Sequence, residues 1–552
     1  MKVYFSSVIC FFLLAIFPNF LIAQALPRVE QMTLEQKVGQ LFIIGFPQQR
    51  VDSQLEDFIK KYKISSFILF KRNIRSLSQV AKMNSDLKTI ATATTKSFPI
   101  IAVDQEGGQV ARVPTRPQIP NAMSIGQTQD ASLAYSLGQE TAKIIRTLGF
   151  NMNLAPVLDI CNPHVESFIG QRSFGSDADQ VSSVGVALSK GLLDEAVIPT
   201  AKHFPGVGSV SGDPHKISVE YDATAETLYA QDLKPFSEFS KLGTNTAIML
   251  SHLSYPALDP TNTPATLSAE IIKSILRKRV GFNGLIVTDD IQMKGLINFK
   301  TPYDAALAAL KAGADIVMMT WSFKDQAKAI EKVRSAVASG ELSEEELTEK
   351  VSRILLVKQY LEKVNSPLEK FPNSNVVALS TKRLREIESK ILDFNVNVAL
   401  KNFSHDDATR TPASISERTT PVSVCVFSPK SSFIESYKKS DAGASGIKIR
   451  PKSKASLIAQ SFSRYECQYG VYVVYGPSSA GVLSKLSKEV SEKLLLVNLS
   501  LPNLVDSNKK YLGVVNLFFA HPDAGKKIAD HFPLFLKNET SRELAEDKVE
   551  PL

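Results

Sequence analysis

A glycine-rich segment carries two residues suited to proton transfer. Residues 202–215 read Lys-His-Phe-Pro-Gly-Val-Gly-Ser-Val-Ser-Gly-Asp-Pro-His, which places Asp213 two positions before His215. A carboxylate at that spacing can hold an imidazole in one tautomer and favour its protonated form. Because the ordinary pKa of histidine is about 6.5, such a group can protonate a leaving oxygen and later deprotonate water. Taken alone, the pair is more typical of a turn in which the aspartate caps backbone groups and the histidine is solvated.

Two donors open the same segment. Lys202 and His203 end an apolar β-type run, so they are expected at the mouth of a pocket, where hydroxyl groups can accept from them. Glycines follow at positions 206, 208 and 212. Since glycine tolerates unusual backbone angles, the segment is predicted to be mobile enough to close over a substrate.

Two adjacent carboxylates end another apolar run, in the sequence Thr-Asp-Asp-Ile-Gln-Met over residues 288–293. Side chains alternate along a strand, so Asp289 and Asp290 should not both face the same side. An ionised carboxylate that faces a pocket can act as a nucleophile. We therefore expect one aspartate to be a nucleophile and the other to fix a loop or a hydrogen-bond network.

The elements that must position these residues follow a repeating pattern. From about residue 33 to 365, short apolar runs alternate with longer stretches of helical periodicity, which indicates parallel βα units. The eight apolar runs are Leu41–Phe46, Ser65–Phe70, Pro99–Asp104, Asn153–Asp159, Thr200–Gly206, Ala247–Leu253, Leu285–Asp290 and Ala314–Thr320. Amphipathic stretches between them include 131–148, 180–196, 226–242 and 268–280. Eight such units predict a (β/α)8 barrel of the TIM type over residues 26–365.

Polar residues at the ends of these runs support that architecture, because barrel enzymes place their chemistry at the carboxyl ends of strands. The strand-end positions hold Asp104, Asp159, Lys202, His203, His252, Asp289 and Asp290. Any one of them alone could be a satisfied structural group, but a series of polar groups closing apolar strands indicates a site.

Outside the barrel the sequence predicts three further segments. Residues 1–25 read as a signal peptide, with Lys2, an apolar stretch over 8–22 and a small-x-small site that ends at Ala25. Pro18 and Asn19 interrupt the apolar stretch, which falls short of the roughly 20 residues that a spanning helix needs. Residues 366–420 are expected to be a helical connector and linker. Residues 421–552 are predicted to form a smaller αβα doubly wound domain without a dinucleotide fingerprint.

Composition excludes some partners. The formal net charge is +8 over 552 residues, and basic residues are scattered among acidic ones, so nucleic-acid binding is not indicated. The charge is compatible with peripheral association with an anionic cell wall or membrane surface. After removal of the signal peptide three cysteines remain. Cys425 and Cys467 can pair, although buried thiols are an equally good interpretation. No cysteine has the spacing of a metal site.

The Lys-His-Phe-Pro-Gly-x-Gly-x4-Asp-x-His pattern of residues 202–215, with matching segments over about 33–340, resembles glycoside hydrolase family 3. Specifically, it resembles the β-N-acetylglucosaminidase branch in its exported two-domain form. The resemblance implies that Asp289 is the nucleophile and that His215 is the acid/base oriented by Asp213. It also implies that the sugar is bound by Asp104, Arg112, Arg172, Lys202 and His203. Glu106, two positions after Asp104, is taken as structural.

The expected activity is a retaining exo-hydrolysis of terminal β-linked GlcNAc, with no metal or organic cofactor. The expected substrates are peptidoglycan fragments of the GlcNAc-β-1,4-MurNAc type or chitooligosaccharides. Three alternatives stay open. A histidine base would not repel phosphate, which leaves a phosphorylase. The second alternative is the β-glucosidase branch of the family, although that branch usually takes its acid/base carboxylate from outside residues 202–215. A non-catalytic wall-binding protein is disfavoured because the whole catalytic set is present. The signal peptide predicts a periplasmic, cell-envelope or extracellular location.

Overall fold

The computed structural model of the 552-residue chain describes most of the barrel and much of a second domain. The described residues are 29–161, 167–208, 210, 217–297, 299–365, 374–404, 423–441, 444–449, 455–474, 477–498, 511, 513–517 and 523–532. The predicted signal peptide lies outside them, and so do Asp213 and His215.

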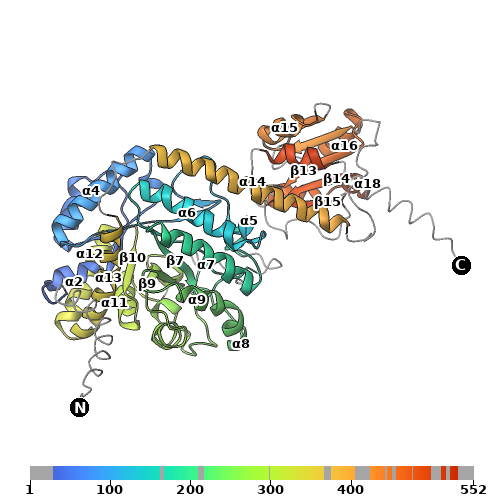
Figure 1. The fold of residues 1–552 in the computed structure, drawn as a ribbon. Coiled ribbons are helices and arrows are strands. Elements are labelled where there is room, and N and C mark those ends of the chain that lie inside the picture. The colour runs from blue at the N-terminus through green and yellow to red at the C-terminus, as the bar shows by residue number, and fades with distance from the viewer. Residues whose placement is uncertain are drawn as a thin grey trace, which may run out of the picture.

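Eight parallel strands close into a barrel, in the order β1-β10-β9-β8-β7-β6-β3-β2 (Figure 1). Pairing of β1 with both β10 and β2 completes the ring. The barrel strands are β1 (Phe42–Ile44), β2 (Ser66–Leu69), β3 (Ile100–Val103), β6 (Met152–Asn153), β7 (Ile198–Phe204), β8 (Ala247–Leu250), β9 (Leu285–Asp290) and β10 (Ile316–Met319). A two-stranded hairpin of β4 (Gln105–Gly107) and β5 (Val110–Ala111) follows β3. The predicted barrel is confirmed.

Helices surround these strands. The α-helices of this part are α2 (Leu34–Gln40), α3 (Ser53–Tyr62), α4 (Leu77–Thr95), α5 (Ala122–Gly126), α6 (Ala131–Thr147), α7 (Ala178–Asp194), α8 (Ala225–Thr227), α9 (Leu233–Ser240), α10 (Lys294–Ile297), α11 (Pro302–Ala312), α12 (Phe323–Ala338) and α13 (Glu344–Val364). Short 3-10 segments are η1 (Lys71–Asn73), η2 (Gly170–Arg172) and η4 (Ala265–Leu267), and π-helical segments are η3 (Leu228–Asp232) and η5 (Glu270–Arg279). The amphipathic stretches predicted from the sequence fall on α6, α7, the α8–α9 region and η5.

Local sequence explains why many of these helices begin where they do. Asp130 accepts from the backbone N–H of Leu133 at 3.0 Å at the start of α6, and Asp177 accepts from that of Gln180 at 2.8 Å at the start of α7. Such side chains satisfy backbone donors that have no partner inside the helix. The strands themselves are almost entirely buried, so apolar burial drives closure of the barrel.

A long helix, α14 (Ser374–Ser404), leads from the barrel to the second domain. It packs beside α6 and reaches β15 of the second sheet (Figure 1). Arg383 of α14 forms an ion pair with Glu140 of α6 at 3.3 Å. At the other side, Lys527 pairs with Asp393 of α14 at 2.6 Å. The helix thus makes polar contacts with both parts of the chain.

The second domain is a five-stranded parallel sheet in the order β12-β11-β13-β14-β15. Its elements are β11 (Val424–Ser428), α15 (Ser431–Lys438), β12 (Ser445–Lys448), α16 (Ala455–Arg464), β13 (Tyr469–Val474), α17 (Pro477–Leu483), α18 (Lys488–Glu492), β14 (Leu494–Asn498), β15 (Gly513–Asn516) and a helix over 524–532. Alternate residues of β11 belong to two separate apolar clusters, Val424 and Val426 to one and Cys425 and Phe427 to the other. Both sheet faces are therefore covered, which confirms the doubly wound prediction.

Cys425 and Cys467 form a disulfide across 42 residues of this domain. It joins β11 to the turn between α16 and β13, so of the two interpretations left open by the sequence the structure supports pairing. Cys161 in the barrel is a buried free thiol.

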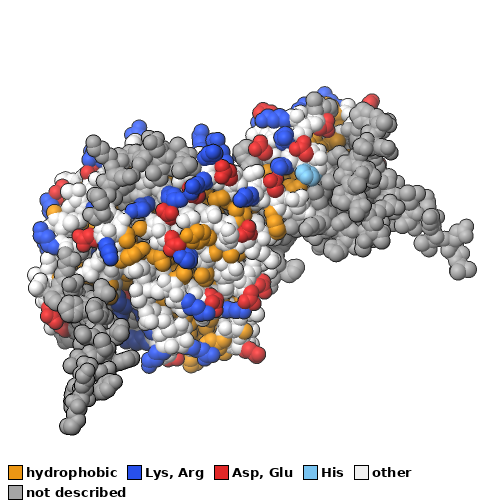
Figure 2. Space-filling model, in the orientation of Figure 1, with side chains coloured by type: hydrophobic (Ala, Val, Ile, Leu, Met, Phe, Trp, Pro, Cys, Tyr) orange, Lys and Arg blue, Asp and Glu red, His pale blue; other side chains and the backbone are white. Residues whose placement is uncertain are grey.

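Charge is mixed on the molecular surface. Figure 2 shows acidic and basic side chains interspersed on one face, with apolar side chains between them. This matches the scattered charges of the sequence. Among the described helices, none is long and apolar enough to cross a bilayer.

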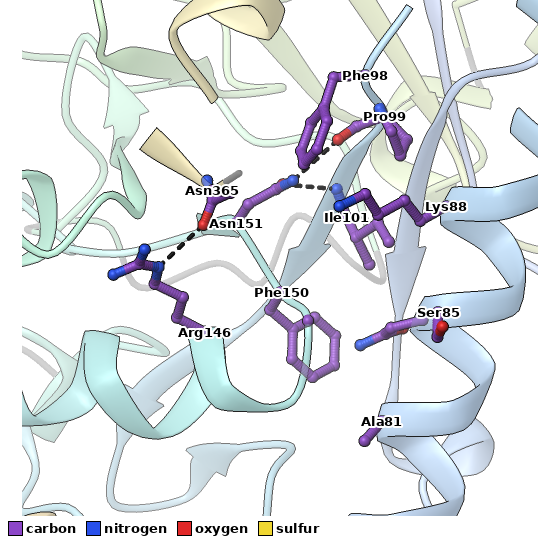
Figure 3. Close-up of a pocket in the computed structure, with 12 residues that line it drawn as sticks. Ala81, Ser85, Lys88, Phe98, Pro99, Ile101, Arg146, Phe150, Asn151 and Asn365 are labelled. Carbon is purple, nitrogen blue, oxygen red and sulfur yellow. Dashed lines mark hydrogen bonds between the residues drawn. The ribbon is translucent and has the colours of Figure 1, made fainter. Parts of the chain in front are cut away.

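A small cavity lies at the amino-terminal ends of β3 and β6, between these strands and α4 (Figure 3). In it, Asn151 accepts from the backbone N–H of Ile101 and donates to the carbonyl of Pro99, both at 2.8 Å. Arg146 donates to Asn365 at 2.9 Å. Polar residues at this end of a barrel serve stability, because catalysis takes place at the opposite end.

We predict that Asn151→Ala destabilises the protein by about 1–3 kcal/mol, because it leaves a buried N–H and a buried carbonyl without partners. Urea unfolding followed by circular dichroism measures the change. The exposed Asn283, which donates to the Gly281 carbonyl, supplies the matched control Asn283→Ala, with a loss of less than about 0.5 kcal/mol. Equal losses in the two variants would show that the paired amide does not support the barrel.

Candidate active site

Five charged side chains from three neighbouring strand ends meet at the carboxyl-terminal mouth of the barrel. Asp104 directly follows β3, Glu106 lies on β4 of the hairpin that comes next, and Arg112 directly follows β5. Arg172 ends η2 in the connection after β6, and Lys202 lies on β7. Because β3, β6 and β7 are consecutive in the barrel, their ends bring these groups together.

Glu106 is the centre of this cluster. Its carboxylate accepts from Arg172 Nε at 2.8 Å and Nη2 at 2.9 Å, and it pairs with Lys202 Nζ at 2.7 Å. Lys202 Nζ also donates to Asp104 Oδ1 at 3.0 Å. Asp104 Oδ2 lies 3.5 Å from Arg112 Nη2. Two carboxylates therefore hold three cations in fixed positions.

Burial and charge set the protonation of the cluster. Burial by itself would raise the pKa of Glu106, but the charges and hydrogen bonds of Arg172 and Lys202 outweigh it and hold that pKa well below its usual range. Burial would lower the pKa of Lys202, but Asp104 and Glu106 together raise it. Glu106 is thus a carboxylate and Lys202 an ammonium group at neutral pH.

Capacity for a ligand remains in this cluster. An ammonium group has three protons, and the carboxylates of Asp104 and Glu106 accept two of those on Lys202. The buried Nε of Arg112 has no hydrogen-bond partner among the described residues. Asp104 keeps acceptor capacity because each carboxylate oxygen can take two hydrogen bonds. Such paired donors and acceptors suit the vicinal hydroxyl groups of a sugar.

Asp159, in the connection after β6, holds His203 and the beginning of the glycine-rich segment. Its Oδ2 lies 2.6 Å from His203 Nδ1. Its Oδ1 accepts from the backbone N–H of His203 at 3.1 Å and of Val207 at 2.9 Å. His203 Nε2 faces Arg172 Nη2 at 3.5 Å. A fully buried carboxylate therefore fixes both a predicted sugar ligand and the start of the segment predicted to carry the acid/base.

The backbone conformation at the start of this segment requires glycine at two positions. Gly206 has φ +129°, and a Cβ at Gly208 would lie 1.9 Å from the carbonyl oxygen of Ile160. The Tyr255 hydroxyl also donates to the Gly206 carbonyl at 2.8 Å. The predicted mobility therefore does not apply to residues 206–208, which are anchored. Gly212 lies outside the described residues.

The two aspartates at the end of β9 differ as the alternation predicts. Asp290 is buried, accepts from the hydroxyl of Thr320 and from the backbone N–H of Gln292, and has a pKa raised to about 6 by burial. It therefore fixes a hydrogen-bond network. Asp289 is more exposed, and its Oδ1 accepts from the backbone N–H of Asp290 at 2.7 Å. Of the pair, Asp289 is the more exposed at the barrel mouth.

Asp213 and His215 lie outside the described residues, but the chain on both sides of them is placed. On one side, Val207 is bound to Asp159. On the other, the Ser218 hydroxyl donates at 2.9 Å to the carbonyl of Gly295, six positions after Asp289. Both flanks thus lie at the mouth of the barrel.

Sequence reasoning brought Asp104, Arg112, Arg172, Lys202 and His203 to one site, and the structure places all five together. It took Glu106 as structural, but did not foresee that this residue joins two of them. It named Asp159 as a strand-end polar group without giving it a partner. Within the described residues, no group of three histidine, cysteine, aspartate or glutamate side chains is arranged to hold a metal ion.

The profile of the "Glycosyl hydrolase family 3 N terminal domain" matches residues 33–357, which cover the whole barrel. The chain belongs to glycoside hydrolase family 3. The family predicted from residues 202–215 is thereby confirmed. Asp104, Lys202 and Asp289, at the ends of β3, β7 and β9, all lie within the matched family 3 domain.

Relatives within family 3 extend the comparison. The chain is 31% identical over 354 residues to "Beta-hexosaminidase A" of Pseudoalteromonas piscicida, and the match covers 60% of this chain and 59% of that protein. It is 33% identical over 301 residues to a "Beta-hexosaminidase" of Idiomarina loihiensis, covering 53% and 86% of the two chains. A solved family 3 β-N-acetylglucosaminidase from Paenibacillus superposes with a TM-score of 0.76 at 27% identity, covering 91% of this chain and 97% of the other. That match extends beyond the barrel into the second domain.

We predict that Glu106→Gln lowers the free energy of unfolding by about 3–5 kcal/mol at pH 7, because it leaves buried cations without their carboxylate. The pKa of Glu106 is depressed in the folded state, so its stabilisation is present above the unfolded pKa of about 4.3 and is lost as the pH falls below it. The difference between wild type and variant should therefore shrink at pH 3.5. Urea unfolding at both pH values measures it.

Glu341→Gln is the matched control, since Glu341 forms an exposed pair with Lys311 at 3.0 Å. Its loss should stay below about 1 kcal/mol. A Glu106→Gln loss that is the same at both pH values would contradict the ion-pair account.

Proposed function

We propose that the protein is a retaining exo-β-N-acetylglucosaminidase in which Asp289 is the nucleophile and His215, oriented by Asp213, is the acid/base. The observation that carries the proposal is the placement of Asp289 on the same barrel mouth as the Asp104–Glu106–Arg172–Lys202 cluster. The names of the relatives, β-hexosaminidase and β-N-acetylglucosaminidase, support GlcNAc as the sugar.

In the first step the cluster holds the terminal sugar and Asp289 attacks its anomeric carbon. Lys202 and Arg172 donate to sugar hydroxyl groups while Asp104 accepts from them. The Asp289 carboxylate forms a bond to the anomeric carbon as the bond to the leaving oxygen breaks. His215 gives its proton to that oxygen, so the leaving group departs as a neutral alcohol.

In the second step water replaces the carboxylate. Neutral His215 takes a proton from the water molecule as its oxygen attacks the anomeric carbon, and Asp289 leaves as a carboxylate. The two displacements together retain the β-configuration. Asp159 anchors the backbone of Val207, at the start of the segment that contains His215.

The natural substrates that we propose are peptidoglycan fragments of the GlcNAc-β-1,4-MurNAc type, or chitooligosaccharides. Protein residues that contact only the terminal sugar do not distinguish between these two classes of substrate. The formal charge of +8 supports association of the protein with an anionic envelope polymer.

We predict that the protein releases the chromophore from an aryl β-N-acetylglucosaminide and that Asp289→Ala lowers kcat at least about 1000-fold, because the covalent step is lost. Added azide should restore release from the variant and give the α-glycosyl azide, since a small anion can enter the space of the missing carboxylate. Product analysis by NMR identifies the anomer. Asp179→Ala, at an exposed surface pair with Lys234, is the matched control and should retain full activity.

Substrate controls separate the alternatives. Release from the corresponding β-glucoside at the higher rate would place the protein in the β-glucosidase branch. Release that requires phosphate and yields a sugar phosphate would identify a phosphorylase. Binding of GlcNAc oligosaccharides without any turnover would identify a carbohydrate-binding protein.

We also propose that the protein is exported and acts in the periplasm, at the cell envelope or outside the cell. The small-x-small site at Ala25 supports cleavage before Leu26. The Cys425–Cys467 disulfide supports an oxidising compartment, where such bonds form and persist.

Mass spectrometry of the protein recovered from cells should therefore find a chain that begins at Leu26. Replacement of Ala23 and Ala25 by bulky residues should block this processing, because the cleavage site requires small side chains. Recovery of wild-type protein that retains residues 1–25 would contradict the proposal.

A further inference from the structure

Trp321 is the single tryptophan of the chain, and its side chain is largely in solvent. At 65% relative exposure, it is the most exposed of the large apolar residues that the structure describes. It lies between β10 and α12, at the catalytic mouth of the barrel. An exposed indole beside the site offers a flat apolar surface on which a ligand can pack.

Contacts with Arg72 and Gln292 fix the position of the indole. The guanidinium carbon of Arg72 lies 4.5 Å from the centroid of the Trp321 ring and 4.5 Å from that of Phe70. Arg72 Nη2 donates to the carbonyl of Thr320 at 2.6 Å, and the backbone N–H of Trp321 donates to Gln292 Oε1 at 3.0 Å. One ring face is thus covered by a fixed cation, and the exposure of the side chain comes chiefly from the opposite face.

The strand order gives the direction in which a bound glycan runs. The sugar-binding cluster lies at the ends of β3, β6 and β7, whereas Asp289 ends β9 and Trp321 follows β10, the next strand around the barrel. The Thr320 hydroxyl also donates to Asp290, which ties the β10 end to the β9 end. A glycan with its terminal sugar in the cluster and its anomeric carbon at Asp289 therefore continues over the β9–β10 rim.

We propose that the free face of Trp321 is the platform for the leaving-group sugar, the pyranose ring on the far side of the bond that is cleaved. The proposal rests on the proposed function and adds the part of the site that recognises a second sugar. The axial C–H groups of a pyranose form an apolar face that packs on an indole, as aromatic rings do in other carbohydrate contacts. Trp321 makes no contact with the reacting atoms in this assignment and acts through binding of the leaving group.

The test compares substrates with and without a second sugar. For Trp321→Ala we expect kcat/KM on the GlcNAc-β-1,4-GlcNAc disaccharide to fall roughly 10-fold, chiefly through KM, as for loss of one aromatic stacking contact. The kcat/KM on methyl β-N-acetylglucosaminide should stay within about 2-fold, and so should the inhibition constant of free GlcNAc, which occupies the terminal-sugar cluster alone. For Trp321→Phe, kcat/KM on the disaccharide should fall between the values of wild type and Trp321→Ala. Tyr465→Ala, which removes an exposed aromatic ring of the second domain, is the matched control.

The outcomes are distinguishable. Equal losses on the disaccharide and the methyl glycoside, or no loss on either, would overturn the platform and leave the proposed function intact. A change in oligomeric state of Trp321→Ala, measured by analytical ultracentrifugation, would overturn it in favour of an interface between copies. A wild-type protein that cleaves neither substrate would overturn the proposed function itself.

Discussion

The buried pairing of Glu106 with Arg172 and Lys202 is the constraint on which the rest of the site depends. Two cations in a low-dielectric mouth would repel each other and lower the pKa of the lysine, but the carboxylate between them compensates both effects. Their side chains reach this point because β3, β6 and β7 end side by side. Closure of the barrel therefore also sets the positions of the charged groups in the site, because any change in the strand order would separate them.

Much of the barrel follows from sequence periodicity. The predicted run Leu285–Asp290 coincides with β9, because a continuous apolar run and a polar strand end are both encoded locally. The run predicted over 153–159 becomes only the two-residue β6, since Pro156 supplies no backbone N–H and Leu158 donates instead to the Lys202 carbonyl at 2.7 Å. In the second domain, the edge strand β12 is hard to predict, because its short, half-exposed sequence contains Gly446 and has little apolar signal.

The side-chain types at the strand ends indicate where the site lies, but they do not indicate which residues each side chain contacts. Glu106 meets Arg172 across 66 residues, and no local pattern encodes such a pairing. Likewise, nothing near Trp321 in the sequence announces that Arg72, on the other side of β1, lies under its ring. Chemistry that a residue can do is visible in its type and strand position, whereas orientation and protonation arise from contacts that only the closed barrel creates.

The position of Asp159 has a thermodynamic consequence. One carboxylate binds both His203, a proposed sugar ligand, and the backbone of Val207, which begins the segment proposed to carry the acid/base. If His203 binds the sugar as proposed, a ligand that orders His203 would also favour one placement of Val207, and by reciprocity that placement would favour the ligand. In the proposed mechanism, sugar binding and proton transfer therefore depend on the same aspartate, so a substitution on one side would also affect the other.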